Sequence, residues 1–278
     1  MNFWEALLLG VVEGITEFLP VSSTGHLTIV EKLLGLRIDD AGVTAFTAVI
    51  QVGAIIASIV YFRADIVRLA GAWFRGLVNA GARQERDWKM AWLVIAGSIP
   101  IGIVGLLLSD LITGPLRSLW FVVGGLLVWS VVMVLAERLG RQDRSESDLT
   151  LVDALVVGVV QCLALVPGVS RSGATISAGL LRGLDRVSAT RLAFFLAIPA
   201  LTAAGVYEAV GSADDIATSV GWGPTAVATV VSFVVGFASI AWLLRIVAKF
   251  PITVFVGYRV VLAVVIAVLL LTGVVSAT

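Results

Sequence analysis

Long apolar segments are the feature of this sequence that most constrains its fold. A helix needs about 20 apolar residues to cross the hydrocarbon core of a bilayer. Six stretches reach or approach that length, namely 44–62, 91–111, 119–135, 192–210, 225–244 and 252–271. We expect each of them to be a spanning helix, because a spanning segment must satisfy its own backbone hydrogen bonds.

The composition agrees with a membrane protein and excludes other classes. The 278 residues are 59% hydrophobic and only 14% charged, whereas a soluble domain carries about 25% charged residues. The charges of the 19 basic and 19 acidic residues cancel to a net charge of zero, so the chain has no general attraction to polyanions. The sequence therefore predicts an all-α polytopic membrane protein that binds no nucleic acid.

Two further apolar regions are interrupted in the middle. Residues 4–36 contain LPVSSTGH, and residues 151–181 contain VPGVSRSGAT. The apolar run on either side of each break is too short to cross a bilayer alone. Proline stops the first helix, and the serines after it favour the start of a second. We predict that each region is a re-entrant helix–loop–helix hairpin, whose loop lies in protein or lines a wet cavity.

The two interrupted regions also resemble each other. GVVEGITEFLPVSSTG at 10–25 aligns with GVVQCLALVPGVSRSG at 158–173 when small gaps are allowed. We therefore predict two repeats, 1–137 and 151–278, joined by a charged linker at 138–150. Each repeat contains one re-entrant hairpin and three transmembrane helices. Because three crossings are an odd number, the second repeat is upside down relative to the first, which is an inverted-topology repeat.

The distribution of Lys and Arg predicts the orientation. Basic residues cluster in 63–89, 138–150, 182–191 and 245–249, and are rare in the alternate loops. Cytoplasmic loops are the ones enriched in Lys and Arg. Both termini are then outside, the first hairpin opens outward and the second inward. We expect a site that is accessible from the outer side of the membrane.

Glu13 and Glu17 are two acids in an otherwise apolar run. Residues four apart share one face of a helix, and a charge in the bilayer core costs at least about 2.5 kcal/mol. Either one carboxylate is protonated or a cation lies between the two. Carboxylate oxygens suit Mg²⁺ or Ca²⁺, with phosphate oxygens completing the shell. We predict that Glu13 and Glu17 are metal ligands; the alternative is a pair of acids at the membrane interface.

The two interrupting loops carry complementary polar groups. The first contains three consecutive hydroxyls and His26, the only histidine of the chain. Hydroxyls and glycine beside a helix start can present N–H groups to an anion, and a Ser/His/carboxylate set can provide a nucleophile and a proton shuttle. The second loop adds Arg171, whose guanidinium fits phosphate. We expect the two hairpins to meet tip to tip, so that the acids of the first face the guanidinium of the second. The alternative for Arg171 is an ion pair with Glu13 or Glu17 and no ligand.

Gln51 is a polar residue within a predicted span. It either lines the cavity or makes a hydrogen bond between helices, and we favour the hydrogen bond. The chain has no Gly-Lys-Ser/Thr sequence and no G-x-S-x-G sequence. It therefore lacks the motifs of a P-loop nucleotide site and of a nucleophile elbow.

EGITEFLPVSSTGH in the first half and PGVSRSGAT in the second resemble the two motifs of the bacterial undecaprenyl-diphosphate phosphatases, also called bacitracin-resistance proteins. The resemblance covers the full chain. It implies hydrolysis of undecaprenyl diphosphate to undecaprenyl phosphate and inorganic phosphate. This reaction recycles the carrier lipid for peptidoglycan synthesis and protects against bacitracin. The resemblance also implies a location in the bacterial plasma membrane.

The resemblance assigns roles to the residues of both loops. It implies catalytic roles for Glu17, Ser23, His26 and Arg171, and metal binding by Glu13 and Glu17. The substrate-binding positions that it implies are Ser22, Thr24, Ser170, Ser172 and Thr175. We expect Ser23 to attack the terminal phosphorus while His26 handles protons, with activated water as the alternative nucleophile. Mg²⁺ or Ca²⁺ is the expected cofactor, and a polyprenyl diphosphate lipid is the expected substrate.

Two other functions remain open on the sequence. Inverted repeats with broken helices are also typical of transporters, so a transporter or flippase of a phosphorylated lipid or small anion is the main alternative. The third is a lipid-binding scaffold without catalysis. The sequence predicts contact with membrane lipids and leaves a homodimer open.

Overall fold

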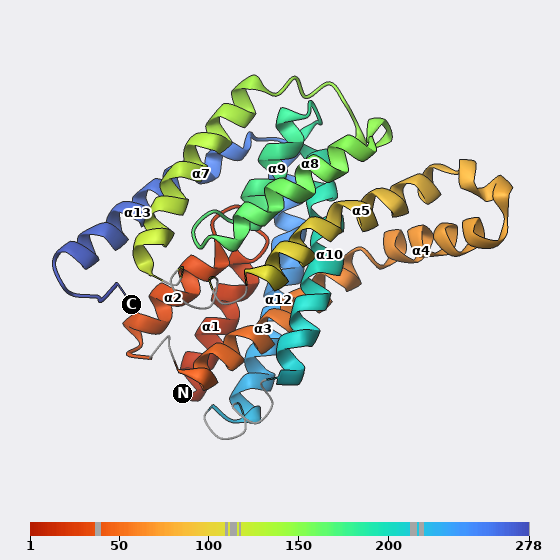
Figure 1. Cartoon of the computed structure of the whole chain (residues 1–278). Coiled ribbons are helices and arrows are strands. Elements are labelled where there is room, and N and C mark those ends of the chain that lie inside the picture. The colour runs from red at the N-terminus through yellow and green to blue at the C-terminus, as the bar shows by residue number, and fades with distance from the viewer. Residues whose placement is uncertain are drawn as a thin grey trace.

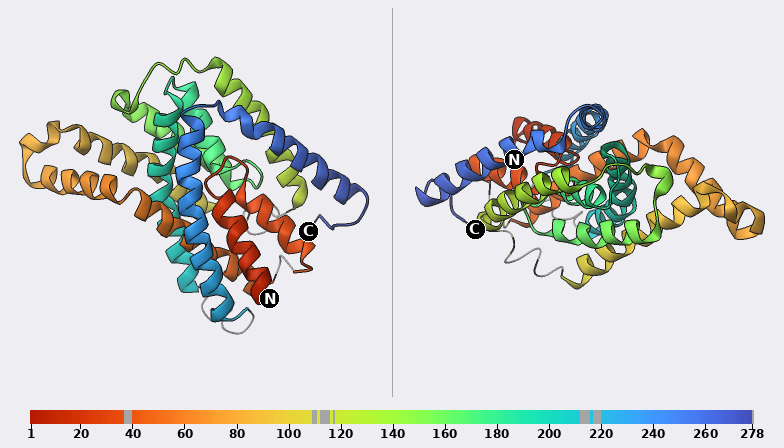
Figure 2. Two further views of the ribbon diagram at one scale, coloured as in Figure 1. Left: turned by 180° about the vertical axis from the view of Figure 1, so that it is seen from behind. Right: turned by 90° about the horizontal axis from the view of Figure 1, so that it is seen from above.

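The computed structural model describes residues 1–36, 40–108, 111, 116, 118–211, 216 and 220–277. Over these residues the chain forms eleven α-helices with short 3₁₀ turns and no β-strand. Figures 1 and 2 show a bundle of roughly parallel and antiparallel helices, from which one hairpin projects sideways.

In the described part of the chain, six helical segments are long and apolar enough to cross a membrane, which agrees with a polytopic membrane protein. They include α3 (Ala41–Tyr61), α5 (Arg86–Leu107), α7 (Leu119–Leu139), α10 (Arg186–Gly211), α12 (Trp222–Val247) and α13 (Val256–Leu271), the last preceded by a 3₁₀ turn at Ile252–Phe255. They coincide with the six apolar stretches of the sequence. The end of the stretch 91–111 falls partly outside the described residues.

Each interrupted region forms two short helices around a loop. The first contains α1 (Phe3–Thr16) and α2 (Ser23–Leu33). The second contains α8 (Leu151–Gln161), a 3₁₀ turn at Cys162–Leu165, and α9 (Arg171–Leu181). All four helices are shorter than the about 20 residues that a crossing needs. The predicted helix–loop–helix form is therefore present in both regions.

Close glycine contacts hold the short helices against the long ones. α1 packs on α12, and α8 packs on α5. A Cβ atom at Gly10 would lie 2.5 Å from the backbone oxygen of Ala228, and one at Gly158 would lie 2.1 Å from that of Gly97. Glycine at these positions lets the backbones approach, as small residues do in membrane helix pairs.

The helix α4 (Arg63–Val78) was not predicted from the sequence, which shows only a polar stretch there. It is antiparallel to the first half of α5, and the two project from the bundle (Figures 1 and 2). Arg68 pairs with Asp65 on the same helix and with Asp87 across the hairpin, while Val67 and Phe74 are exposed. The helix is amphipathic, so a search for continuous apolar runs does not detect it.

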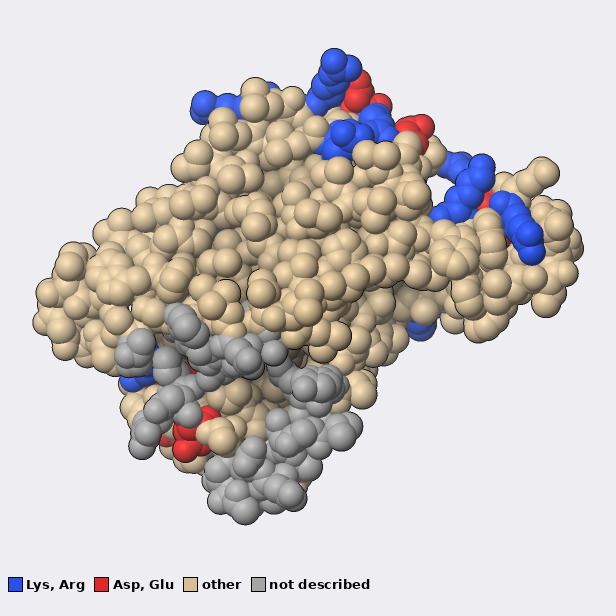
Figure 3. Space-filling view, viewed as in Figure 1, with Lys and Arg blue, Asp and Glu red and all other residues tan. Residues whose placement is uncertain are grey.

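The two ends of the bundle differ in charge. The N- and C-termini lie at one end, and the linker lies at the other (Figures 1 and 2). On the face shown in Figure 3, most Lys and Arg side chains gather at the linker end and along the α4–α5 hairpin. An excess of Lys and Arg at one end is what the positive-inside rule associates with the cytoplasmic side of a membrane protein.

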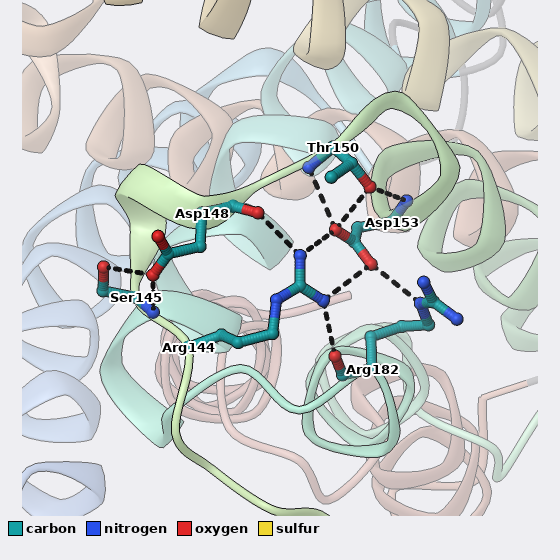
Figure 4. A network of polar contacts seen from close by, with 6 residues as sticks. All are labelled: Arg144, Ser145, Asp148, Thr150, Asp153 and Arg182. Carbon is teal, nitrogen blue, oxygen red and sulfur yellow. Dashed lines mark hydrogen bonds and ion pairs between the residues drawn. The ribbon is translucent and has the colours of Figure 1, made fainter.

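A polar network fixes the linker to the second hairpin (Figure 4). Arg144 Nη2 lies 2.6 Å from Asp153 Oδ2, and Arg182 Nε lies 2.7 Å from Asp153 Oδ1. Arg144 also donates to the backbone oxygen of Arg182 at 2.7 Å. Burial by itself would raise the pKa of Asp153, but hydrogen bonds from Arg144, Thr150 and Arg182 outweigh it and hold that pKa well below its usual range. The network thus joins the beginning of α8 to the end of α9.

Candidate active site

The loops of the two hairpins touch at their tips. The backbone N–H of Gly168, in the second loop, donates to Ser22 Oγ of the first loop at 3.1 Å. In return, Ser170 Oγ donates to the backbone oxygen of Leu19 at 3.5 Å. Residues about 150 positions apart in the sequence therefore form one polar cluster inside the bundle.

Glu17 and Arg171 meet at this cluster, as tip-to-tip packing of the hairpins predicts. Arg171 Nη2 lies 2.8 Å from Glu17 Oε1, and both side chains are largely buried. Ser23 Oγ donates to Glu17 Oε2 at 2.5 Å. Gln51 Nε2, from α3, donates to Oε1 at 3.4 Å, which confirms the predicted hydrogen bond between helices. Glu17 is thus the shared acceptor of Arg171, Ser23 and Gln51.

Glu13 lies one turn before Glu17 on α1 and is 1% exposed. Its Oε1 atom is buried without a hydrogen-bond partner among the described residues. A free carboxylate oxygen beside a second carboxylate fits a divalent cation, which prefers oxygen ligands. Within the described part of the chain, no group of three or more His, Cys, Asp or Glu side chains could hold a metal ion. Any cation at Glu13 and Glu17 would therefore need further oxygens from other groups, such as hydroxyls, amides, backbone carbonyls, substrate or water.

Two serines begin the inner helices in the same unusual backbone conformation. Ser22 has φ 76° and Ser170 has φ 73°, in a region that costs a residue with a side chain of order 1–3 kcal/mol. Each is an N-cap: Ser22 Oγ accepts from Gly25 N at 3.4 Å, and Ser170 Oγ accepts from Gly173 N at 3.2 Å. The N-terminal ends of α2 and α9, which favour anions, are brought together by this geometry.

Both ring nitrogens of His26 are hydrogen-bonded to groups other than Ser23, whose protons His26 was expected to handle. Its Nδ1 lies 2.7 Å from the backbone oxygen of Ser22, and its Nε2 lies 2.6 Å from the hydroxyl of Tyr258. Neither bond involves Ser23, whose hydroxyl is directed at Glu17. The hydroxyl and the imidazole of the first loop therefore have different partners in this structure.

A small hollow adjoins the Glu17–Arg171 pair. Its polar lining includes Ser172 and Thr175, although Thr175 Oγ1 is already bonded to the backbone oxygen of Arg171 at 2.8 Å. The apolar lining comes from α9, α10, α12 and the end of α1, through Phe18, Ile176, Ala193, Phe194, Ala197 and Leu243. The exposed Thr24 is not part of the lining. The hollow combines a charged end with an apolar wall.

Arg259 is a central residue that the sequence analysis missed. It lies on α13 and is 0% exposed. Its guanidinium donates to carbonyl oxygens of both loops, at 2.8 Å to Pro20 and 2.9 Å to Gly168. Further acceptors are Ser130 Oγ and the backbone oxygens of Gly125, Leu126 and Val169. The signal was available, because Arg259 is the only charged residue in the apolar stretch 252–271 and such residues are usually functional or paired.

Comparison with known proteins places the chain in a family. Residues 6–265 match the family described as bacitracin resistance protein BacA. The chain belongs to the BacA family. An undecaprenyl-diphosphatase 3 of Frankia casuarinae is 58% identical over 278 residues, with all of both chains covered. Undecaprenyl-diphosphatases of Cutibacterium acnes and of Mycobacterium sp. strain KMS are 55% and 53% identical, again over the whole of both chains.

The matched region of this BacA-family chain contains every residue of the polar cluster. Both loops lie within residues 6–265, and so do the two residues of α13 that contact them, Tyr258 and Arg259. The matched segment therefore includes both loops and the part of α13 that contacts them.

Proposed function

We propose that this BacA-family protein is a membrane phosphatase that hydrolyses undecaprenyl diphosphate to undecaprenyl phosphate and inorganic phosphate. The observation that carries the proposal is the contact of Glu17 with both Arg171 and Ser23 where the two loops meet. Full-length similarity to undecaprenyl-diphosphatases supports the substrate. The reaction recycles the carrier lipid for cell-wall synthesis and confers bacitracin resistance.

The diphosphate binds to Arg171 and to the N-terminal ends of α2 and α9. One guanidinium nitrogen of Arg171 bonds to Glu17, and an arginine has five N–H donors in all. The others are available for phosphate oxygens, which guanidinium binds in a two-pronged manner. Ser172 and Thr175, which line the adjoining hollow, contribute to this pocket, and Ser22 and Ser170 shape the backbone that faces the anion.

Ser23 is the proposed nucleophile, and Glu17 is its proton acceptor. As Ser23 Oγ forms a bond to the terminal phosphorus, its proton passes to Glu17 Oε2, 2.5 Å away. The bond from that phosphorus to the bridging oxygen breaks, and undecaprenyl phosphate leaves. Water then attacks the phosphoserine phosphorus, the bond from that phosphorus to Ser23 Oγ breaks, inorganic phosphate leaves, and Glu17 returns the proton to the serine oxygen. His26 exchanges protons at Nε2, because its Nδ1 is held by the Ser22 carbonyl.

A divalent cation fits beside this pair. Glu13 and Glu17 would hold Mg²⁺ or Ca²⁺, and the unpartnered, buried Oε1 of Glu13 supports this assignment. When bound, the cation would neutralise charge on the phosphate oxygens. Without the cation, Glu13 is a buried carboxyl group whose Oε1 has no hydrogen-bond partner among the described residues, while Arg171 balances the charge of Glu17.

The inverted-topology repeat is part of the proposal, with the division at 1–137, 138–150 and 151–278. The aligned glycines Gly10 and Gly158 support it, since each lies against the backbone of a long helix from the other half. The equal backbone conformations of Ser22 and Ser170 also support it. The basic linker end is the cytoplasmic end in a bacterial plasma membrane, and the first hairpin opens to the outer side, from which the lipid headgroup enters.

A transporter or flippase is the second candidate, because broken helices that meet within a bundle are typical of transporters. Phosphate release decides between the two. Purified protein with Mg²⁺ should release phosphate from farnesyl diphosphate, and Ser23→Ala should reduce the rate by about 10²–10⁴-fold. Thr28→Ala, which removes a hydroxyl on the outer part of α2, is the matched control. If Ser23→Ala keeps full activity, the nucleophile is not the serine but water activated by Glu17.

A further inference from the structure

The imidazole of His26 has a side-chain partner that no motif of the sequence indicates. Its Nε2 lies 2.6 Å from the hydroxyl of Tyr258, which is 232 positions away in the chain. The two rings are almost parallel, with an angle of 7° between their planes and 5.6 Å between their centres. Tyr258 therefore restrains both the direction of Nε2 and the plane of the ring.

The other ring nitrogen determines which atom donates this hydrogen bond. Nδ1 lies 2.7 Å from the backbone oxygen of Ser22, and a carbonyl oxygen can only accept. Nδ1 must therefore carry a hydrogen. In the neutral ring Nε2 then has a lone pair, so the Tyr258 hydroxyl donates to it. The Ser22 carbonyl thus selects the tautomer of neutral His26, and the Tyr258 hydroxyl adapts to it as the donor to Nε2.

Tyr258 is itself fixed in position. It precedes Arg259, whose buried guanidinium is bonded to the backbone of Pro20 and Gly168. Tyr258 is 50% exposed, whereas His26 is 9% exposed. The phenol thus lies between the buried imidazole and the surroundings of the protein, and the helix that carries it is tied to both loops.

We propose that Tyr258 is a positioning residue of the phosphatase reaction, because its hydroxyl and ring fix the direction of Nε2, the only basic atom of the neutral His26 ring. The Ser22 carbonyl selects the tautomer, and Tyr258 holds that imidazole in place. The inference rests on the proposed function, in which His26 exchanges protons at Nε2.

Nitrogen NMR tests the hydrogen bond directly, because His26 is the only histidine of the chain. Full-length protein labelled with ¹⁵N in the imidazole should show one protonated nitrogen, Nδ1, and one hydrogen-bonded, unprotonated nitrogen, Nε2. Tyr258→Phe keeps the ring and removes the hydroxyl, and should shift the Nε2 signal. Tyr61→Phe is the matched control, since Tyr61 packs against Phe62 and Phe237. An Nε2 signal that does not change in Tyr258→Phe overturns the inference.

Kinetics with farnesyl diphosphate test whether Tyr258 acts through His26. Tyr258→Phe should lower kcat about tenfold with little change in KM, a part of the about 10²–10⁴-fold that a proton-handling group contributes. His26→Gln should lose more, and the double variant should be no slower than His26→Gln alone. Losses that multiply in the double variant overturn the inference, because the two residues then act independently.

The outcomes separate this inference from the proposed function. If wild-type protein releases phosphate but His26→Gln does so equally well, the inference fails and the phosphatase proposal stands. If wild-type protein releases no phosphate, the proposed function fails. An NMR shift in Tyr258→Phe then describes a structural bond, and the positioning role is overturned with the function.

Discussion

Replacement of Arg259 by methionine tests how far one buried cation holds the two loops together. The guanidinium is 0% exposed and makes its two shortest bonds to the carbonyl oxygens of Pro20 and Gly168, at 2.8 and 2.9 Å. A buried acceptor that loses its donor costs about 1–3 kcal/mol, so these two carbonyls account for about 2–6 kcal/mol. Methionine avoids the burial of a charge, which offsets part of this cost. We expect a net loss of about 2–4 kcal/mol.

The assay combines thermal unfolding with phosphate release in detergent. For a chain of this size, 1 kcal/mol corresponds to a shift in Tm of about 2–4 °C, so Arg259→Met should unfold roughly 5–15 °C lower. Activity should fall by about 10²-fold or more, because small displacements of reacting groups have effects of that size. Arg63→Met is the matched control, since Arg63 is exposed and its guanidinium donates to the backbone oxygen of Val60 at the end of the preceding helix, α3.

Arg259→Lys separates charge from geometry. Lysine keeps the positive charge but presents its donors from a single point, so it cannot reach both loops as the guanidinium does. We expect Arg259→Lys to lose most of the activity while it keeps more of the thermal stability than Arg259→Met. Wild-type activity and Tm in both variants would show that the loops hold their positions without Arg259.

Three further predictions concern other parts of the molecule. Glu17→Gln, which can neither pair with Arg171 as an anion nor take a proton from a nucleophile, should lower kcat for phosphate release by about 10²–10³-fold. Asp153→Asn should lose about 1–3 kcal/mol at pH 7; because the folded pKa of Asp153 is depressed, its contribution is complete above the ordinary pKa of about 3.9 and declines below it. The difference in Tm from wild type should therefore shrink below about pH 4. Gly158→Ala, whose Cβ would lie 2.1 Å from the Gly97 oxygen, should destabilise by about 1–3 kcal/mol in thermal unfolding.

Each of these has its own control. For Glu17→Gln, an unchanged Tm would show that the loss of activity comes from the reaction and not from unfolding. Full activity of this variant would exclude Glu17 as the proton acceptor. For Asp153→Asn, a Tm difference that stays constant down to pH 3 would contradict the coupling to its ionisation. For Gly158→Ala, the control is Gly102→Ala on α5, where an added Cβ has no heavy atom within 4 Å; equal stability of the two variants would contradict the close-packing argument.

Patterns local in the sequence predicted much of the fold. The six apolar stretches coincide with the six long helices, because length and hydropathy suffice to specify a spanning helix. The breaks were predictable from Pro20 and Pro167, and the meeting of Glu17 with Arg171 followed from the expected tip-to-tip hairpins. The assignment of catalytic and metal-binding roles stays a prediction.

The remainder depends on contacts between distant segments. The partners of Arg259 are mainly backbone carbonyls of three separate segments, and backbone acceptors leave no residue signature. The ring of His26 turns toward Tyr258 rather than Ser23 because α13 packs nearby, which no local pattern records. The amphipathic α4 was missed because its apolar residues are spaced along one face rather than contiguous.

The position of Arg259 in the chain affects biogenesis. α13 follows both hairpins in order of synthesis, so a ribosome delivers the loops to the membrane before the arginine that clamps them. Nascent chains that have not yet inserted α13 would hold Ser23 and Arg171 in unclamped loops. Hydrolysis of lipid diphosphates would therefore begin only once insertion is complete, and prematurely terminated products would be inert.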